Sequence, residues 1–169
     1  NLVETVNTNV TGDRYARTLL HGVDVNNWFR THVTEHIVGN SDSYSYGGGQ
    51  NMYAYKPTQS PWKLMIWDID FAFAAQAPNS DMMGIGGANV GPRNDVAPFN
   101  RLYWQAMIDA VNGPLLAERS NPIIDSRYNG MRTNGGSVSS GSNIKSFVSQ
   151  RRTYILSQWK ANTAPFRVT

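Results

Sequence analysis

Two short segments on either side of a proline-bounded turn limit the possible folds more than any other part of this 169-residue chain. Residues 51–56 alternate tyrosine with Met52 and Ala54, and residues 62–67 read Trp-Lys-Leu-Met-Ile-Trp. The five residues between them begin and end with proline, which predicts a β-hairpin. Because the second segment is largely apolar, we expect it to be a strand that is covered on both faces.

Apolar residues at three- and four-residue steps predict helices around this hairpin. We expect a helix over Asp24–Val38, with Asp24 as its N-cap and Gly39 as a left-handed residue that ends it. Phe99–Val111 and roughly Ile144–Trp159 show the same periodicity. The segments without an apolar period are expected to be loop or irregular: residues 40–50, 75–98 and 114–141.

These elements predict an α+β fold that is mostly helical and has one central hairpin. The chain has the length of a single domain, whose main part we expect over residues 23–169. Residues 1–22 are polar and rich in Thr and Asn, and we interpret them as a lead-in segment with a short helix around Tyr15–Leu20. Asn1 opens the sequence and no signal-peptide pattern follows, which favours a processed product or a piece of a longer protein.

Composition excludes several classes of protein. The 15 basic and 12 acidic residues give a net charge of +3, but the basic residues are scattered, so we expect no nucleic-acid partner. No window of eighteen or more apolar residues occurs, so we expect no membrane span. Cysteine is absent, which excludes disulfides, cysteine-ligated zinc and thiol catalysis without fixing the compartment.

Paired acidic residues follow the second predicted strand. With a strand period of two, Asp68 and Asp70 would face the same side, and a divalent cation is a natural partner for two such carboxylates. They could instead cap a turn or pair with an arginine, or they could be ligands of a calcium-stabilised extracellular domain. His32 and His36 lie four residues apart but lack an HExxH pattern, so we interpret them as surface or hydrogen-bonded core histidines.

A family resemblance rests on motifs within residues 23–74. After the predicted helix come Gly39-Asn40-Ser41-Asp42-Ser43-Tyr44, then Asn51-Met52-Tyr53-Ala54-Tyr55, then Trp67-Asp68-Ile69-Asp70-Phe71-Ala72-Phe73. In order and spacing these motifs resemble the spore-coat-protein-H (CotH) family of atypical protein kinases. The segment Ile144–Trp159, with its internal arginine, is similar to the family's closing helix.

The resemblance implies the mostly helical C-lobe of an atypical protein-kinase-like fold that uses ATP and Mg²⁺. Asp42 would be the catalytic aspartate that orients the substrate hydroxyl, and Asp68 would hold magnesium on the ATP phosphates. Asp70 would be a further metal ligand or would orient one, and Asn51 would supply an amide near the second ion. Asn51 follows Asp42 by nine residues, whereas an ordinary kinase places asparagine five residues after its catalytic aspartate.

The resemblance also implies partners and a location. The substrate would be a Ser/Thr-rich protein of the bacterial cell or spore surface, and the chain itself would be extracellular or surface-bound. A kinase's nucleotide lobe precedes these motifs, but residues 1–22 contain no lysine and no glycine-rich hairpin. We therefore expect a missing N-terminal portion of the same protein as a partner. The alternative is a non-enzymatic extracellular binding or structural module that keeps the scaffold.

Overall fold

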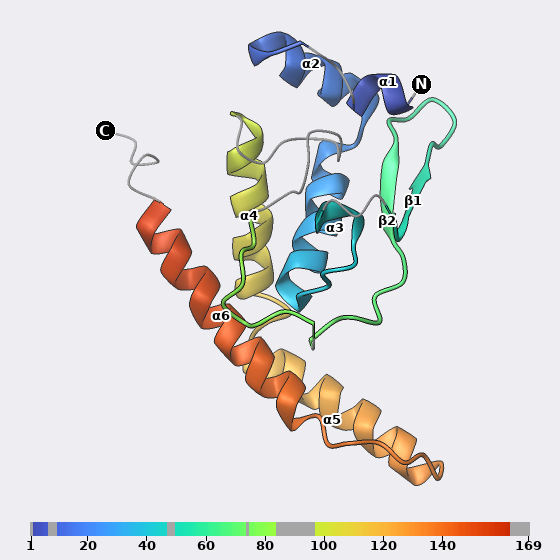
Figure 1. The fold of residues 1–169 in the computed structure, drawn as a ribbon, viewed down its shortest axis with the longest axis vertical. Coiled ribbons are helices and arrows are strands. Elements are labelled where there is room, and N and C mark those ends of the chain that lie inside the picture. The colour runs from blue at the N-terminus through green and yellow to red at the C-terminus, as the bar shows by residue number, and fades with distance from the viewer. Residues whose placement is uncertain (1, 7–9, 47–49, 74, 84–96, 163–169) are drawn as a thin grey trace. The chain divides into compact units, whose positions relative to one another are not determined.

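A computed structural model describes most of the chain (Figure 1). The described residues are 2–6, 10–46, 50–73, 75–83 and 97–162. They divide into two compact units, which we describe separately. The amino-terminal unit comprises Asn1–Gln76 and Asp81–Ala106, and the carboxy-terminal unit comprises Ala77–Ser80 and Met107–Thr169.

The order of elements agrees with a mostly helical α+β chain that contains one hairpin. The elements are α1 (Leu2–Val6), α2 (Gly12–Gly22), α3 (Val25–Val38), the 3₁₀ helix η1 (Tyr44–Tyr46), β1 (Met52–Tyr55), β2 (Lys63–Ile66), α4 (Phe99–Val111), α5 (Ala117–Thr133) and α6 (Ser142–Asn162).

Helix α3 has the capping residues that the sequence predicts. The Asp24 side chain accepts a hydrogen bond from the Asn27 main-chain nitrogen at 3.1 Å, which satisfies one of the unpaired donors of the first turn. Gly39 ends the helix in the left-handed conformation with φ of 68°, which glycine adopts without the steric cost that a residue with a side chain would have. The chain therefore leaves α3 in a defined direction toward residues 40–42.

The core of the amino-terminal unit joins α2, α3 and α4 through aromatic contacts. Phe29 of α3 meets Phe99 and Tyr103 of α4 edge-on, with ring centroids 5.9 and 5.6 Å apart. Tyr15 of α2 meets Phe99 in the same way at 5.9 Å. Residue 15 lies in the segment expected to be a lead-in, but this segment belongs to the same compact unit as α3. These buried rings fix the position of α3 and hence of the residues that follow it.

The hairpin packs on α3 by one face only. Strands β1 and β2 are antiparallel. Leu64 of β2 is buried, and its main-chain nitrogen donates a hydrogen bond to Asn27 Oδ1 of α3 at 2.7 Å. On the other face, Tyr53, Met65 and Trp67 are about half exposed. The expectation of a strand covered on both faces is therefore wrong. A two-stranded sheet beside a single helix leaves one face uncovered, and apolar side chains alone could not reveal this (Figure 1).

The carboxy-terminal unit contains the largest error of the sequence-based prediction. The sequence predicts irregular structure over residues 114–141, but α5 occupies Ala117–Thr133 and lies beside α6. Helix α5 has no buried residue, so its sequence shows no apolar stripe, and Pro122 lies within it. Both features hide a helix from a search for apolar periodicity.

Helix α6 includes a buried arginine. The helix spans Ser142–Asn162, slightly more than the predicted Ile144–Trp159. Arg151 is fully buried, and its Nη1 donates to the main-chain oxygens of Pro78 and Ser80 at 3.0 and 2.6 Å. These bonds join α6 to the short Ala77–Ser80 segment of its own unit and provide acceptors for Nη1 of the buried guanidinium, which reduces the cost of burying this charge.

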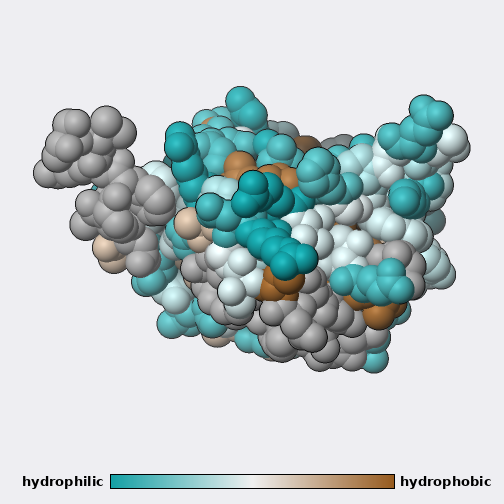
Figure 2. Space-filling view, turned by 90° about the horizontal axis from the view of Figure 1, so that it is seen from above, coloured by the Kyte–Doolittle hydropathy of each residue, from teal (hydrophilic) through white to brown (hydrophobic). Residues whose placement is uncertain are grey.

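Among the coloured residues of the face shown in Figure 2, hydrophilic and intermediate residues predominate, and hydrophobic residues form small separate patches. Among the residues that the structure describes, no helix is long and apolar enough to cross a membrane.

Candidate functional site

Asp42 lies in the turn between α3 and η1, where it is half-buried. Both oxygens of its carboxylate accept hydrogen bonds from side-chain amides. Asn51 Nδ2 lies 2.7 Å from Oδ2, and Gln50 Nε2 donates to Oδ1. Asn51 Nδ2 also lies 2.9 Å from the main-chain oxygen of Asp42. The structure thus brings together two of the predicted site residues, Asp42 and Asn51.

Asn51 and Asp68 share an uncommon backbone conformation. Their φ angles are 56° and 51°, in the left-handed region. This conformation costs free energy for any residue with a side chain, although Asn and Asp tolerate it better than most. Residues held in this way concentrate at functional sites. Gln59 and Phe73 have the same conformation, so the backbone at Asn51 and Asp68 is compatible with a functional site but does not by itself indicate one.

Strand pairing places Asn51 and Asp68 at the same end of the hairpin. Met52 pairs with Ile66 in the antiparallel register, and this pair is the last one at that end. Asn51 directly precedes it on one strand, and Asp68 follows it by two residues on the other. The hairpin therefore delivers both residues to one edge of the amino-terminal unit.

Hydrogen bonds tie the Asp68 loop to the end of α3. The side-chain nitrogen of Asn40 lies 3.5 Å from the main-chain oxygen of Asp68. Farther along the loop, the Phe73 main-chain nitrogen lies 2.6 Å from the Val38 main-chain oxygen. Since Asp42 follows Asn40 by two residues, the segments that carry Asp42 and Asp68 are joined at this point.

The carboxylates of Asp68 and Asp70 are exposed. Within the described ranges, neither forms an ion pair with lysine or arginine, so the alternative of an arginine partner gains no support there. Strand β2 ends at Ile66, and the backbone of Asp68 has the left-handed conformation. The strand period that placed Asp68 and Asp70 on one side does not extend to them, and the role of Asp70 stays a prediction.

The site offers ligands for magnesium without a preformed cage. Over the described parts of the chain, no three or more His, Asp or Glu side chains lie close enough to hold a metal ion together. Magnesium needs only one or two carboxylates, because water and substrate phosphates complete its shell. The exposed carboxylate of Asp68 meets this requirement. Asn51 turns its amide nitrogen to Asp42, so its side-chain oxygen is an acceptor that could hold a cation at the same end of the hairpin.

Glu35 is a buried acid beside this site. Its exposed fraction is 3%, and burial raises its pKa from 4.5 to about 7, while a hydrogen bond from Asn40 acts in the opposite direction. Asn40 Nδ2 lies 3.3 Å from Glu35 Oε2. Near neutral pH this carboxyl group therefore changes its charge within the fold.

The two histidines of α3 lie in the core. His36 Nδ1 lies 2.8 Å from both the Tyr103 hydroxyl and the Met82 main-chain oxygen, as expected of a hydrogen-bonded core histidine. His32 is also buried, but neither of its ring nitrogens has a hydrogen-bond partner among the described residues. Burial, together with the nearby His36, lowers the pKa of His32 to about 3, so His32 is neutral at physiological pH.

Sequence reasoning missed three polar residues around the site: Glu35, Asn40 and Gln50. Gln50 is adjacent to Asn51, and Asn40 directly follows the glycine that ends α3, so their positions were visible in the sequence. Their partners were not, because each bond joins segments whose distance depends on the folded backbone. Glu35 lies within a helix pattern that gave no reason to expect a buried acid.

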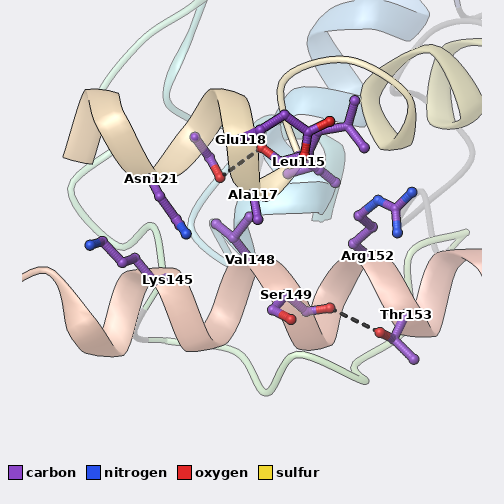
Figure 3. Close-up of a pocket in the computed structure, with 11 residues that line it drawn as sticks. Leu115, Ala117, Glu118, Asn121, Lys145, Val148, Ser149, Arg152 and Thr153 are labelled. Atoms are coloured by element: carbon purple, nitrogen blue, oxygen red, sulfur yellow. Dashed lines mark hydrogen bonds between the residues drawn. The ribbon is translucent and has the colours of Figure 1, made fainter. Parts of the chain in front are cut away.

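A separate hollow of about 310 Å³ lies between α5 and α6 in the carboxy-terminal unit (Figure 3). Lys145, Ser149 and Arg152 of α6 line one side, and Glu118 and Asn121 of α5 line the other. Two of its basic residues have partners: Lys145 pairs with the Asp125 carboxylate at 2.5 Å, and Arg152 Nε donates to the Val111 main-chain oxygen at 3.1 Å. None of the predicted site residues lines this hollow.

Comparisons with known proteins address the family. A family model described as CotH kinase protein matches residues 1–133, which include α1 to α5 and all four predicted site residues. No curated protein and no solved structure matches the chain. The match covers 133 of 169 residues and ends before α6. It confirms the resemblance carried by the three motifs, and the chain belongs to the CotH kinase family.

Proposed function

We propose that this chain carries the catalytic and metal-binding residues of an atypical protein kinase, which transfers the γ-phosphate of ATP to a Ser or Thr hydroxyl. Its membership of the CotH kinase family supports a kinase-like function with ATP and a divalent cation. The proposal rests mainly on one observation. Asn51 holds the Asp42 carboxylate at 2.7 Å, at the end of the hairpin from which Asp68 also emerges.

Asp42 is the catalytic residue in this proposal. The two amides that bond its oxygens fix the orientation of the carboxylate, and each oxygen keeps lone-pair capacity for another donor. A substrate hydroxyl that donates to Asp42 is directed at the γ-phosphorus. Its oxygen forms the new P–O bond, the bond from phosphorus to the β–γ bridging oxygen of ATP breaks, and ADP leaves. The hydroxyl proton passes to Asp42 and then to solvent.

Asp68 and Asn51 hold the metal and the phosphates in place. Magnesium bound there supplies neutralisation of the phosphate charge. Asp68 contributes one carboxylate oxygen and Asn51 its amide oxygen, and the left-handed backbone at both residues sets where these groups emerge. Asp70 acts as a further ligand or orients Asp68. The protein's contribution is thus positioning and electrostatics, which needs no unusual nucleophile.

The substrate and the location follow from the family in this proposal. The acceptor is a Ser/Thr-rich protein of the cell or spore surface, and phosphorylation takes place outside the cytoplasm or at the surface. Residues 1–22 contain no lysine that could hold the phosphates. A further portion of the same protein supplies that lysine, so activity should be tested in the complete gene product.

We expect Asp42→Asn to lower kcat for phosphotransfer by about a hundredfold and to leave the KM for ATP nearly unchanged. Asparagine keeps the size of the side chain but cannot take the hydroxyl proton. The assay follows transfer of labelled γ-phosphate to a Ser/Thr-rich acceptor with Mg²⁺, and with EDTA as the blank. Asp125→Asn serves as a matched control, because it removes an exposed carboxylate of α5. Equal losses in the two variants would rule out a specific role for Asp42.

A non-enzymatic surface module is the second candidate. The uncovered face of the hairpin favours it, because Tyr53, Tyr55 and Trp67 are about half exposed there and aromatic side chains are effective contact residues. Calorimetry with Mg·ATP on the complete gene product separates the two functions. Saturable binding supports the kinase, and the absence of binding supports the module.

A further inference from the structure

Asn40 connects the three segments that form the candidate site. It is fully buried directly after Gly39, the residue that ends α3. Its main-chain oxygen accepts from the Ser43 nitrogen at 3.3 Å, within the turn that carries Asp42. Its side-chain nitrogen reaches the Asp68 main-chain oxygen at 3.5 Å. The Asn40 side chain thus contacts α3 and the Asp68 loop, and its main chain contacts the turn that carries Asp42.

The orientation of the Asn40 amide is fixed by its surroundings. Its NH₂ group faces two acceptors, the Glu35 carboxylate at 3.3 Å and the Asp68 carbonyl at 3.5 Å. The opposite orientation would place the amide oxygen against two other oxygens, which is repulsive. Asn40 Oδ1 is buried and has no partner among the described residues, so the amide depends on the bonds made by its nitrogen.

Glu35 is the buried partner that holds this amide. It is 3% exposed, and over the described ranges Asn40 is the residue that donates to its carboxylate. The main chains reinforce the contact, because the Asn40 nitrogen lies 3.0 Å from the Glu35 oxygen. An acid in this position is costly to bury, and its one evident effect is to orient Asn40 toward Asp68.

We propose that Glu35 is a positioning residue of the kinase site, which fixes the Asp68 loop relative to the Asp42 turn through the side chain of Asn40. Glu35 has no contact with substrate in this scheme and acts only through Asn40. The inference rests on the proposed function for its role in catalysis. The loop-holding step itself stands on the contacts alone and can be measured without substrate.

Two substitutions at Glu35 separate the hydrogen bond from the side chain's bulk. Glu35→Leu removes the acceptor, whereas Glu35→Gln keeps an oxygen that can accept from Asn40. The Phe73 amide donates to the Val38 main-chain oxygen and so joins the Asp68 loop to α3. We expect Glu35→Leu to increase the hydrogen-exchange rate of this amide by about tenfold. We expect Glu35→Gln to exchange at nearly the wild-type rate. Mn²⁺·ATP affinity, measured by electron paramagnetic resonance, should fall by about tenfold in the leucine variant and recover in the glutamine variant.

Val33→Ala is the matched control, because Val33 is a buried residue of the same helix without a polar contact to the site. Val33→Ala should lower the stability of α3 without selectively increasing the hydrogen-exchange rate of the Phe73 amide. If Glu35→Leu does not fold, Asn40→Asp tests the same step by replacing the donor with an acceptor of equal size. Wild-type exchange at Phe73 in both variants, or equal exchange in the leucine and glutamine variants, would overturn the proposal. If even the wild-type protein fails to bind Mn²⁺·ATP, the kinase proposal fails, while the exchange rates still decide whether Glu35 holds the loop.

Discussion

Asp68→Ala should reduce Mg²⁺-dependent phosphotransfer by about a thousandfold, because a bound metal supplies several kcal/mol of charge stabilisation in the transition state. Asp68 is the exposed carboxylate at the end of the hairpin, and alanine offers no oxygen to replace it. The loss should appear both in kcat and in the KM for Mg·ATP, since the metal takes part in binding as well as in transfer. Steady-state kinetics on the complete gene product measure both quantities.

Asp70→Ala provides the comparison within the same loop. If Asp70 only orients Asp68, the Asp70→Ala substitution should lower the rate of phosphotransfer by about tenfold. The fold should tolerate both substitutions, because both side chains are exposed and neither forms an ion pair with a described residue. An Asp68→Ala protein that keeps more than about a third of the wild-type rate would show that Asp68 does not hold the metal.

Glu35→Gln should remove a large pH dependence from the stability of the protein. Burial raises the pKa of Glu35 from 4.5 in the unfolded chain to about 7 in the fold. The folded state therefore binds this proton more tightly, and wild-type stability falls as the pH rises from about 4.5 through 7. The shift corresponds to about 3 kcal/mol between the two limits. Glutamine does not ionise, so the variant lacks this loss.

The measurement is the free energy of unfolding in urea at pH 4.5, 6 and 8.5. We expect the variant to gain about 3 kcal/mol relative to wild type between the lowest and the highest pH. His32, whose pKa is lowered to about 3, destabilises both proteins in acid by the same mechanism and cancels in the difference. A difference that stays constant with pH would show that Glu35 is not the buried acid described here.

Helices with an apolar stripe and standard caps were predictable from the sequence. The α4 bounds agree with the prediction, and α3 begins after Asp24 and ends before Gly39 as expected. These features are local, because capping and periodicity depend on residues within a few positions of each other. Helix α5 shows the limit of this reasoning: it buries no residue, so no period marks it.

Motif order selects Asp42, Asn51 and Asp68 as candidates, and the family match covers the positions of all three, while their roles stay predictions. The contact between Asp42 and Asn51 and the left-handed backbone at Asn51 and Asp68 came only with the structure. Glu35 could not have been predicted, since its role depends on burial and on the direction of the Asn40 side chain. Such features depend on tertiary packing, which a pattern of residue types does not encode.

Paramagnetic broadening by Mn²⁺·ATP is the most direct test of a single metal–nucleotide site at the end of the hairpin. Mn²⁺ replaces Mg²⁺ at such sites and broadens the amide signals of nearby residues in an isotopically labelled protein. We predict strong broadening at Ser43, Asn51 and Asp68, weaker broadening at Gln59 in the turn at the opposite end of the hairpin, and recovery of all signals when excess Mg·ATP is added. Broadening that spares Asn51 and Asp68, or that persists unchanged in Asp68→Ala, would contradict the account.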